Sequence, residues 1–218
     1  MATTSATQFR KARLGRRGLV LGAAGVLLLG AMALDTTVVR IGSDNDLRQQ
    51  AFDPDQFGQR EFPRIREFVL DRAPDAATMA NALAEDRAAA IADYGTMAGA
   101  FPVLAVSVTG VLGEGRSGIF PVAVDGLPDG MTIRVQTGPA INGTELRDVV
   151  GDIAFGDFTN QIEYQDAGAG INRAMSAETL NDLDRDALNG ATVSLTGAFT
   201  MINPKNWLIT PVAFEVRQ

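Results

Sequence analysis

Apolar residues recur at every second position over much of the chain beyond residue 100, and this alternation limits the possible folds more than any other feature. It is visible in the ranges 101–109, 118–127, 131–135, 191–200 and 207–216. A period of two places successive side chains on opposite faces of a β-strand. Glycine-rich turn signals separate the first three segments from one another. The alternation therefore predicts five strands.

Residues 53–95 show helical spacing instead. Phe62 and Ile65 begin a stripe of apolar residues three and four positions apart, which is typical of an amphipathic helix. Pro74 interrupts the pattern, because proline removes a backbone donor and ends most helices. We therefore expect two helices here, the second of them over 76–93.

Two less regular segments separate the third and fourth predicted strands. We expect a strand or strand-loop over 151–164 and a short helix over 176–189, with Ser176 as its N-cap. Three strands, a helix and two strands form the order of an OB-type barrel, and Gly110 and Gly197 within strands suit its coiling. The predicted fold class is mainly β with helices (α+β), an OB-like small β-barrel preceded by an N-terminal transmembrane helix and a two-helix arm. An open β-sandwich is the alternative.

The N-terminal region has the composition of a membrane signal. An uncharged run over 18–34 directly follows a basic cluster formed by Arg10, Lys11, Arg13, Arg16 and Arg17. The positive-inside rule keeps the basic end in the cytoplasm and places the chain beyond Asp35 outside. Two interpretations stay open, an uncleaved signal anchor and a signal peptide cleaved near Ala33. The first predicts a single-pass inner-membrane protein with its C-terminal domain in the periplasm, and the second predicts release into the periplasm.

These features predict four parts. Residues 1–34 form a cytoplasmic basic tip and transmembrane signal anchor, and residues 35–52 form a linker. Residues 53–95 form a helical arm, and residues 96–218 form the OB-like β-barrel.

The composition excludes several classes of function. The 218 residues include no cysteine and no histidine, so a thiol nucleophile, a Ser-His-Asp triad and the commonest zinc ligands cannot be built. All 26 acidic residues but only 14 of the 19 basic residues lie beyond residue 34, which gives that part a net charge of −12. Nucleic-acid binding requires a basic surface. We therefore expect a non-enzymatic protein with no cofactor, no metal and no nucleic-acid partner.

Polar side chains concentrate between residues 137 and 172. Seven of them are candidate ligand-binding residues: Thr144, Arg147, Asp148, Asp157, Asn160, Gln161 and Asn172. Amides, carboxylates and an arginine can bind hydroxyl groups or a carboxylate. They can equally form a buried network, because polar groups in an apolar context need hydrogen-bond partners. An oxygen-ligand metal site and a hydrolytic carboxylate pair are further alternatives, although no loop here has the regular spacing of a calcium site.

The same region carries a family resemblance. The motifs GTELRD (143–148) and DFTNQIEY (157–164) resemble the pattern of an uncharacterised bacterial family, the domain-of-unknown-function family 2291. The resemblance extends over most of the chain from about Phe52. The family is described as predicted periplasmic lipoproteins and is often encoded beside sugar ABC transporters. The resemblance implies an envelope location, but no known activity.

The resemblance also leads to a functional hypothesis. Since the sequence has no cysteine to carry a lipid, a helical anchor in the inner membrane would replace the lipid. We expect a membrane-tethered periplasmic accessory or ligand-binding module, non-enzymatic and linked to sugar ABC transport, with components of the transporter as partners. The alternative is a structural or partner-binding envelope protein that has a buried polar network and no small-molecule ligand.

Overall fold

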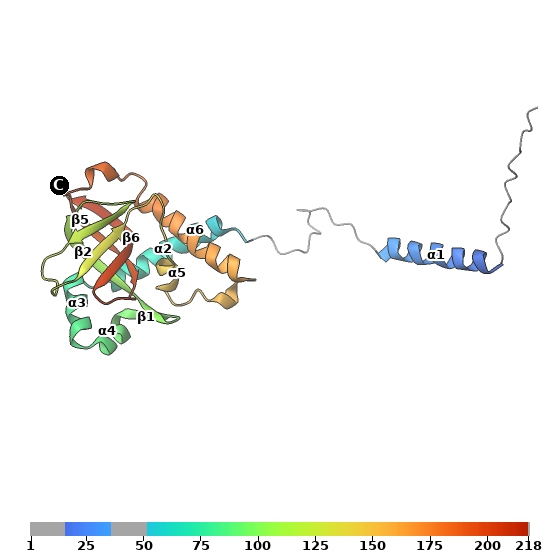
Figure 1. The fold of residues 1–218 in the computed structure, drawn as a ribbon, viewed down its shortest axis with the longest axis horizontal. Helices are drawn as coiled ribbons and strands as arrows, with labels where there is room; N and C mark the ends of the chain where they lie inside the picture. Colours follow the sequence, from blue (N-terminus) through green and yellow to red (C-terminus); the bar gives the residue numbers. More distant parts are fainter. Residues whose placement is uncertain (1–15, 36–51, 218) are drawn as a thin grey trace, which may run out of the picture. The chain divides into compact units, whose positions relative to one another are not determined.

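The computed structural model describes residues 16–35 and 52–217 (Figure 1). It divides into two compact units, Met1–Ala51 and Phe52–Gln218. The predicted basic tip before Arg16 and most of the predicted linker lie outside the described residues.

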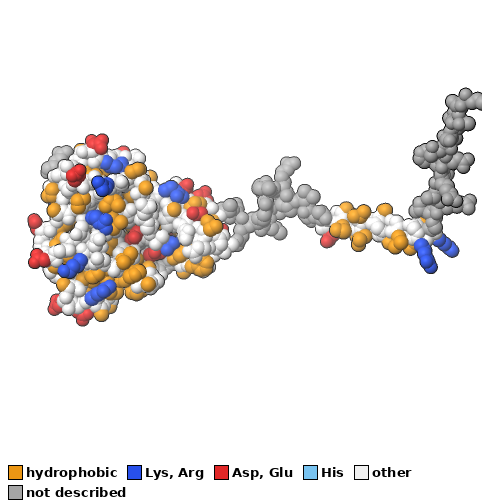
Figure 2. Space-filling model, in the orientation of Figure 1, with side chains coloured by type: hydrophobic (Ala, Val, Ile, Leu, Met, Phe, Trp, Pro, Cys, Tyr) orange, Lys and Arg blue, Asp and Glu red, His pale blue; other side chains and the backbone are white. Residues whose placement is uncertain are grey.

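The first unit contains one described helix, α1 (Arg16–Asp35), which has no buried residue. Figure 2 shows hydrophobic side chains along α1, with basic residues at one end and an acidic residue at the other. By length and composition α1 can cross a membrane. A signal sequence has the same length and composition.

The second unit is built on a closed barrel of five strands. These strands are β2 (Phe101–Leu112), β3 (Ile119–Ala123), β4 (Thr132–Gln136), β5 (Thr192–Thr200) and β6 (Asn206–Arg217). Their order is β2-β3-β4-β6-β5, and pairing between β2 and β5 closes the barrel. Only β4 and β6 are parallel among these pairs. This is the topology of an OB-type barrel, so the predicted fold class is confirmed.

A sixth strand, β1 (Gly95–Ala98), was not predicted. It forms an antiparallel hairpin with the first residues of β2, where Ala98 pairs with Phe101. Four residues are too few to show an alternating pattern, and their position depends on the neighbouring strand.

Three helices precede the barrel strands: α2 (Pro54–Arg72), α3 (Ala76–Glu85) and α4 (Arg87–Tyr94). The predicted break near Pro74 is confirmed, but the prediction of a single helix over 76–93 is wrong. Asp86 is extended, and its carboxylate accepts hydrogen bonds from the backbone N–H groups of Ala88 and Ala89. An N-cap of this kind begins a new helix.

The segment between β4 and β5 differs most from the prediction. Residues 151–164 are neither strand nor strand-loop, and no helix spans 176–189. Instead the helix α6 (Gln161–Thr179) follows a short 3₁₀ turn, and a second 3₁₀ turn occupies Arg185–Ala187. The buried face of α6 consists largely of alanine and glycine, so it shows no stripe of large apolar residues.

The domain has two apolar cores that share the barrel wall. Leu104 and Val106 of β2 belong to the barrel interior, where Trp207 stacks on Phe199 with ring centroids 4.5 Å apart. Ala105, which lies between them on the strand, packs in a second core beneath α2 and α6. Strands buried on both faces have few polar positions, which explains the nearly continuous apolar run at the start of β2.

The helices α2 and α6 lie side by side, as Figure 1 shows, and their contact depends on glycine. A Cβ atom added to Gly58 would overlap the backbone of Gly170, and one added to Gly170 would overlap the carbonyl of Pro54. Since α2 packs on α6 and on the barrel, residues 53–95 belong to the same compact unit as the barrel.

Candidate functional site

Arg147 is the centre of the polar region that the sequence singled out. It lies on the short helix α5 (Glu145–Asp148), and its side chain is only 7% exposed. Its Nε donates to Oδ1 of Asp148 at 2.7 Å, and Nη1 donates to the carbonyl oxygen of Tyr164 at 3.0 Å. The guanidinium also lies over the Tyr164 ring, 3.6 Å from its centroid. The guanidinium therefore already has partners at its edge and on its face.

Two further side chains complete this arrangement. Thr144 Oγ1 donates to Oδ2 of Asp148 at 2.6 Å, so both carboxylate oxygens accept a hydrogen bond. Asn172, which is buried on α6, donates from Nδ2 to the carbonyl of Gly143 at 2.9 Å. We call Thr144, Arg147, Asp148, Tyr164 and Asn172 the Arg147 network. It joins α5 and the turn before it to α6, and it includes four of the seven predicted site residues.

The other three predicted residues lie outside this network, and two of them serve local structure. Asp157 accepts a hydrogen bond from the backbone N–H of Ala154 at 2.9 Å and so closes the 3₁₀ turn. Asn160 is the N-cap of α6, because its Oδ1 accepts from the second and third backbone N–H groups after it. Gln161 is exposed on the first turn of α6. None of these three side chains is hydrogen-bonded to the Arg147 network in the described residues.

A second polar cluster, at one end of the barrel, was not predicted. Buried Gln136 donates from Nε2 to Thr210 Oγ1 and to the carbonyl of Asn142, both at 2.9 Å. The carboxylate of Glu145 accepts from Thr210 Oγ1 at 3.4 Å and from Thr200 Oγ1 at 3.3 Å. This cluster was not recognised from the sequence, because Gln136, Thr200 and Thr210 come from three different strands and meet Glu145 of α5 only in the folded barrel.

Burial raises the pKa of Glu145 above its ordinary value of 4.5, and the negative charge of Asp148 acts in the same direction. The hydrogen bonds from its own backbone, Thr200 and Thr210 lower the pKa but do not cancel these effects. Glu145 therefore holds its proton to higher pH than an exposed glutamate would.

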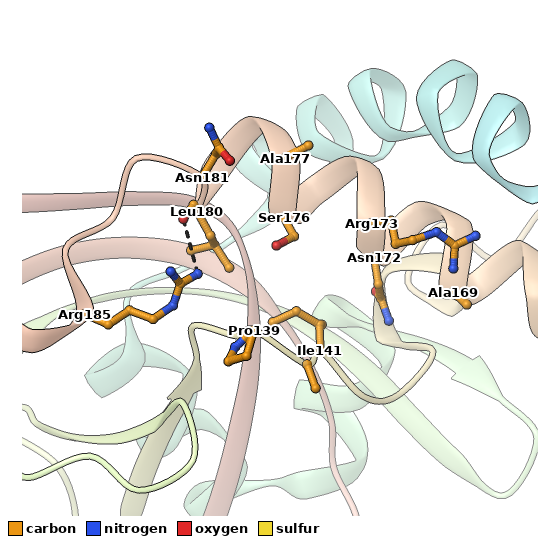
Figure 3. Close-up of a pocket in the computed structure, with 11 residues that line it drawn as sticks. Pro139, Ile141, Ala169, Asn172, Arg173, Ser176, Ala177, Leu180, Asn181 and Arg185 are labelled. Atoms are coloured by element: carbon orange, nitrogen blue, oxygen red, sulfur yellow. Dashed lines mark hydrogen bonds between the residues drawn. The ribbon is translucent and has the colours of Figure 1, made fainter.

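A groove of about 520 Å³ lies between α6 and the loop after β4. Its lining residues are Pro139, Ala140, Ile141, Ala169, Asn172, Arg173, Ser176, Ala177, Leu180, Asn181 and Arg185. Figure 3 shows Asn172 and Ser176 projecting from α6 towards Pro139 and Ile141. Its volume is in the range of small-molecule sites. Asn172 is the one predicted site residue that lines it.

Arg185 closes one end of this groove and was also not predicted. Its Nε donates to the carbonyl of Thr137 at 2.7 Å, and Nη2 donates to the carbonyl of Leu180 at 3.3 Å, which Figure 3 marks. Leu180 is the C-cap of α6, where a cation is favoured by the helix dipole. Arg185 thus joins the end of β4 to the end of α6.

The residues that the structure describes contain no group of three or more carboxylates able to hold a metal ion.

The comparisons with known proteins agree with this fold. The family model of the predicted periplasmic lipoproteins of domain-of-unknown-function family 2291 matches residues 23–215. The domain is similar to the crystal structure of an OB-fold protein from Thermotoga maritima, with a TM-score of 0.61 and 17% identity over 77% of this chain and 100% of that one. At this identity the similarity shows the fold alone. None of the curated proteins matches the chain.

Proposed function

Since the chain belongs to the domain-of-unknown-function family 2291 of predicted periplasmic lipoproteins, we propose that it is a membrane-tethered accessory module of the periplasm with no enzymatic activity. Its tether is α1. The large apolar side chains of α1, such as Leu21, Leu27 and Leu34, are mostly exposed within the structure, and such a surface requires an apolar environment. The sequence has no cysteine for a lipid anchor, so α1 takes the place of the lipid.

The single observation that supports the non-enzymatic role is that the Arg147 network is hydrogen-bonded within the domain. Nε and Nη1 of the guanidinium and both carboxylate oxygens of Asp148 have partners inside the domain, which favours a structural role for this pair over the binding or activation of a substrate. A largely buried hydrogen-bonded network stabilises a structure and favours one arrangement of its elements. The module then acts by presenting its surface to a partner, and the family resemblance favours a sugar ABC transporter as that partner.

Co-purification tests this function. The tagged full chain is extracted from its own membranes in mild detergent, beside a control in which α1 carries an unrelated domain. We expect the permease and ATP-binding subunits of a sugar transporter to be enriched with the full chain and not with the control. Equal recovery from both, or no transporter subunit with either, would contradict the proposal.

The groove beside α6 favours a second candidate function, the binding of a small hydroxylated ligand. The Ser176 hydroxyl and the Asn172 amide both project into it, and such groups recognise sugar hydroxyls. A thermal-shift screen of the full chain in detergent against mono- and disaccharides tests this. A stabilising sugar should lose its effect in Ser176→Leu, which fills the groove, and keep it in Gln161→Ala. If no sugar stabilises the wild type, the groove is not a sugar site.

A further inference from the structure

Five aromatic rings cluster where α2 and α6 begin. Neighbouring rings pack edge-on or tilted, with centroids 5.4–5.7 Å apart. We define the aromatic end as these rings together with the exposed isoleucine in the first turn of α6: Phe52, Phe57, Phe155, Phe158, Ile162 and Tyr164. Figure 1 shows α2 and α6 starting at the same end of the domain.

The aromatic end is open to solvent, unlike the two cores. Phe155 is 50% exposed and Ile162 is 69% exposed, and the other four members are only half-buried. Isolated exposed apolar residues are ordinary, but a contiguous group with several rings marks an interaction surface.

This surface is held in place by residues of the DFTNQIEY motif. Asp157 closes the 3₁₀ turn that carries Phe155, and Asn160 caps the helical turn that carries Ile162. Tyr164 in turn lies beneath the guanidinium of Arg147. The capping bonds and the Arg147 network therefore present the aromatic end as a rigid surface.

The connection to α1 limits how far the aromatic end can lie from a bilayer that α1 spans. Only 16 residues separate Asp35, the last residue of α1, from Phe52, which is itself a member of the aromatic end. From Asp35 to Phe52 there are 17 steps between consecutive Cα atoms, which span at most about 61 Å when the chain is fully extended. This inference rests on the proposed function, in which α1 spans a bilayer. The aromatic end can then lie no farther from the lipid surface than the extended length of this connection.

We propose that the aromatic end docks on the lipid surface that α1 spans. Aromatic side chains favour the headgroup level of a bilayer, where an apolar ring and polar neighbours are both accommodated. The nearby cations Arg60 and Arg173 are paired with Glu61 and Asp55. The chain beyond residue 34 is strongly acidic, so the surface binds electrically neutral headgroups by apolar contact rather than anionic lipid by charge.

The absence of cysteine from the sequence makes a site-specific test simple. Ile162→Cys and Ile202→Cys are each made in the full chain, spin-labelled and reconstituted into phosphatidylcholine vesicles. Ile202 is a matched control, because it is 67% exposed and lies in the turn after β5. We expect the label at position 162 to collide several-fold less often with a water-soluble nickel complex than the label at 202, and more often with oxygen. Phe155→Asp, added to Ile162→Cys, should restore nickel access.

Flotation of the same vesicles separates the two proposals. If the chain does not float with the vesicles, the proposal that α1 is an anchor is wrong, and the docking proposal, which depends on it, is wrong as well. If it floats and the two labels have equal nickel access, anchoring stands and docking is wrong. Immersion of both labels would indicate general adsorption and also overturn the proposal. Protection of position 162 in native membranes but not in vesicles would show that the aromatic end binds a protein instead.

Discussion

The barrel interior and the side chain of Arg147 are both buried, yet they are held in place by opposite means. The interior around Trp207 and Phe199 contains apolar contacts drawn from all five barrel strands. The network contains a buried cation whose hydrogen-bond partners are a carboxylate and a carbonyl. The barrel interior is packed so closely that it has no room for water. In the Arg147 network, protein groups form the hydrogen bonds that water would otherwise form with the polar side chains. The comparison teaches that a polar motif typical of a family can be a structural joint.

The barrel interior and the Arg147 network should also differ in the amino-acid substitutions that they tolerate. An apolar core accepts other apolar side chains of similar volume, whereas a hydrogen-bonded network requires defined donors and acceptors. Substitutions that preserve volume should therefore spare the barrel, and substitutions that preserve charge should not spare the network.

The largest effect is expected in the barrel. Trp207→Ala removes the largest fully buried side chain, which also donates from Nε1 to the carbonyl of Pro204. It should lower the free energy of unfolding by about 3–5 kcal/mol, since large-to-small changes leave a cavity. Urea unfolding followed by circular dichroism measures the loss, because Trp207 is the only tryptophan and cannot serve as its own probe. Trp207→Phe should cost much less, and an equal loss would mean that the indole hydrogen bond dominates.

Arg147→Ala breaks the network and should lower the free energy of unfolding by about 2–3 kcal/mol, because Asp148 and the Tyr164 carbonyl each lose a charged donor. Arg147→Lys should recover only part of this loss. An ammonium group cannot contact both partners and the Tyr164 ring in the way that a planar guanidinium does. If the lysine variant were as stable as the wild type, charge alone would hold the network together and the contrast with the barrel would weaken.

Asn160→Ala tests whether the N-cap in the DFTNQIEY motif stabilises the first turn of α6. Loss of the N-cap should cost about 1 kcal/mol. The neighbouring change Gln161→Ala is the control, because Gln161 is exposed and should change stability by less than about 0.5 kcal/mol. Equal melting temperatures for the two variants would contradict the capping role.

The smallest effect concerns pH. The pKa of Glu145 is raised in the folded state, so its contribution to stability is complete below its ordinary value of 4.5 and is lost as the pH rises through the folded-state pKa. Glu145→Gln removes this loss and should be more stable than the wild type at neutral pH. The difference should disappear in acid. Melting temperatures of both proteins across pH 4–7 measure it, and a difference independent of pH would show that ionisation of Glu145 is not its cause.

Much of the barrel is predictable from sequence because a strand shows its pattern locally. The alternation through Leu104 and Val106 and the break at Pro74 each depend on neighbours along the chain. α6 was missed for the opposite reason, since Gly168 and Gly170 on its buried face provide close approach and no hydrophobic signal.

The candidate site was predictable only in part. The motif indicated Arg147 and its neighbours, but residue types cannot distinguish a ligand site from a structural network. That distinction depends on partners such as the Tyr164 carbonyl, which lies 17 positions away, and on Gln136 and Thr210, whose segments meet only in the closed barrel.

The contact of Gly58 with Gly170 permits one angular setting of α2 on α6. A residue inserted into α2 ahead of Gly58 would turn everything before it by about 100° around the helix axis. Phe52 would then leave the aromatic end. Two glycine residues thus determine where Phe52 lies on the surface of the domain.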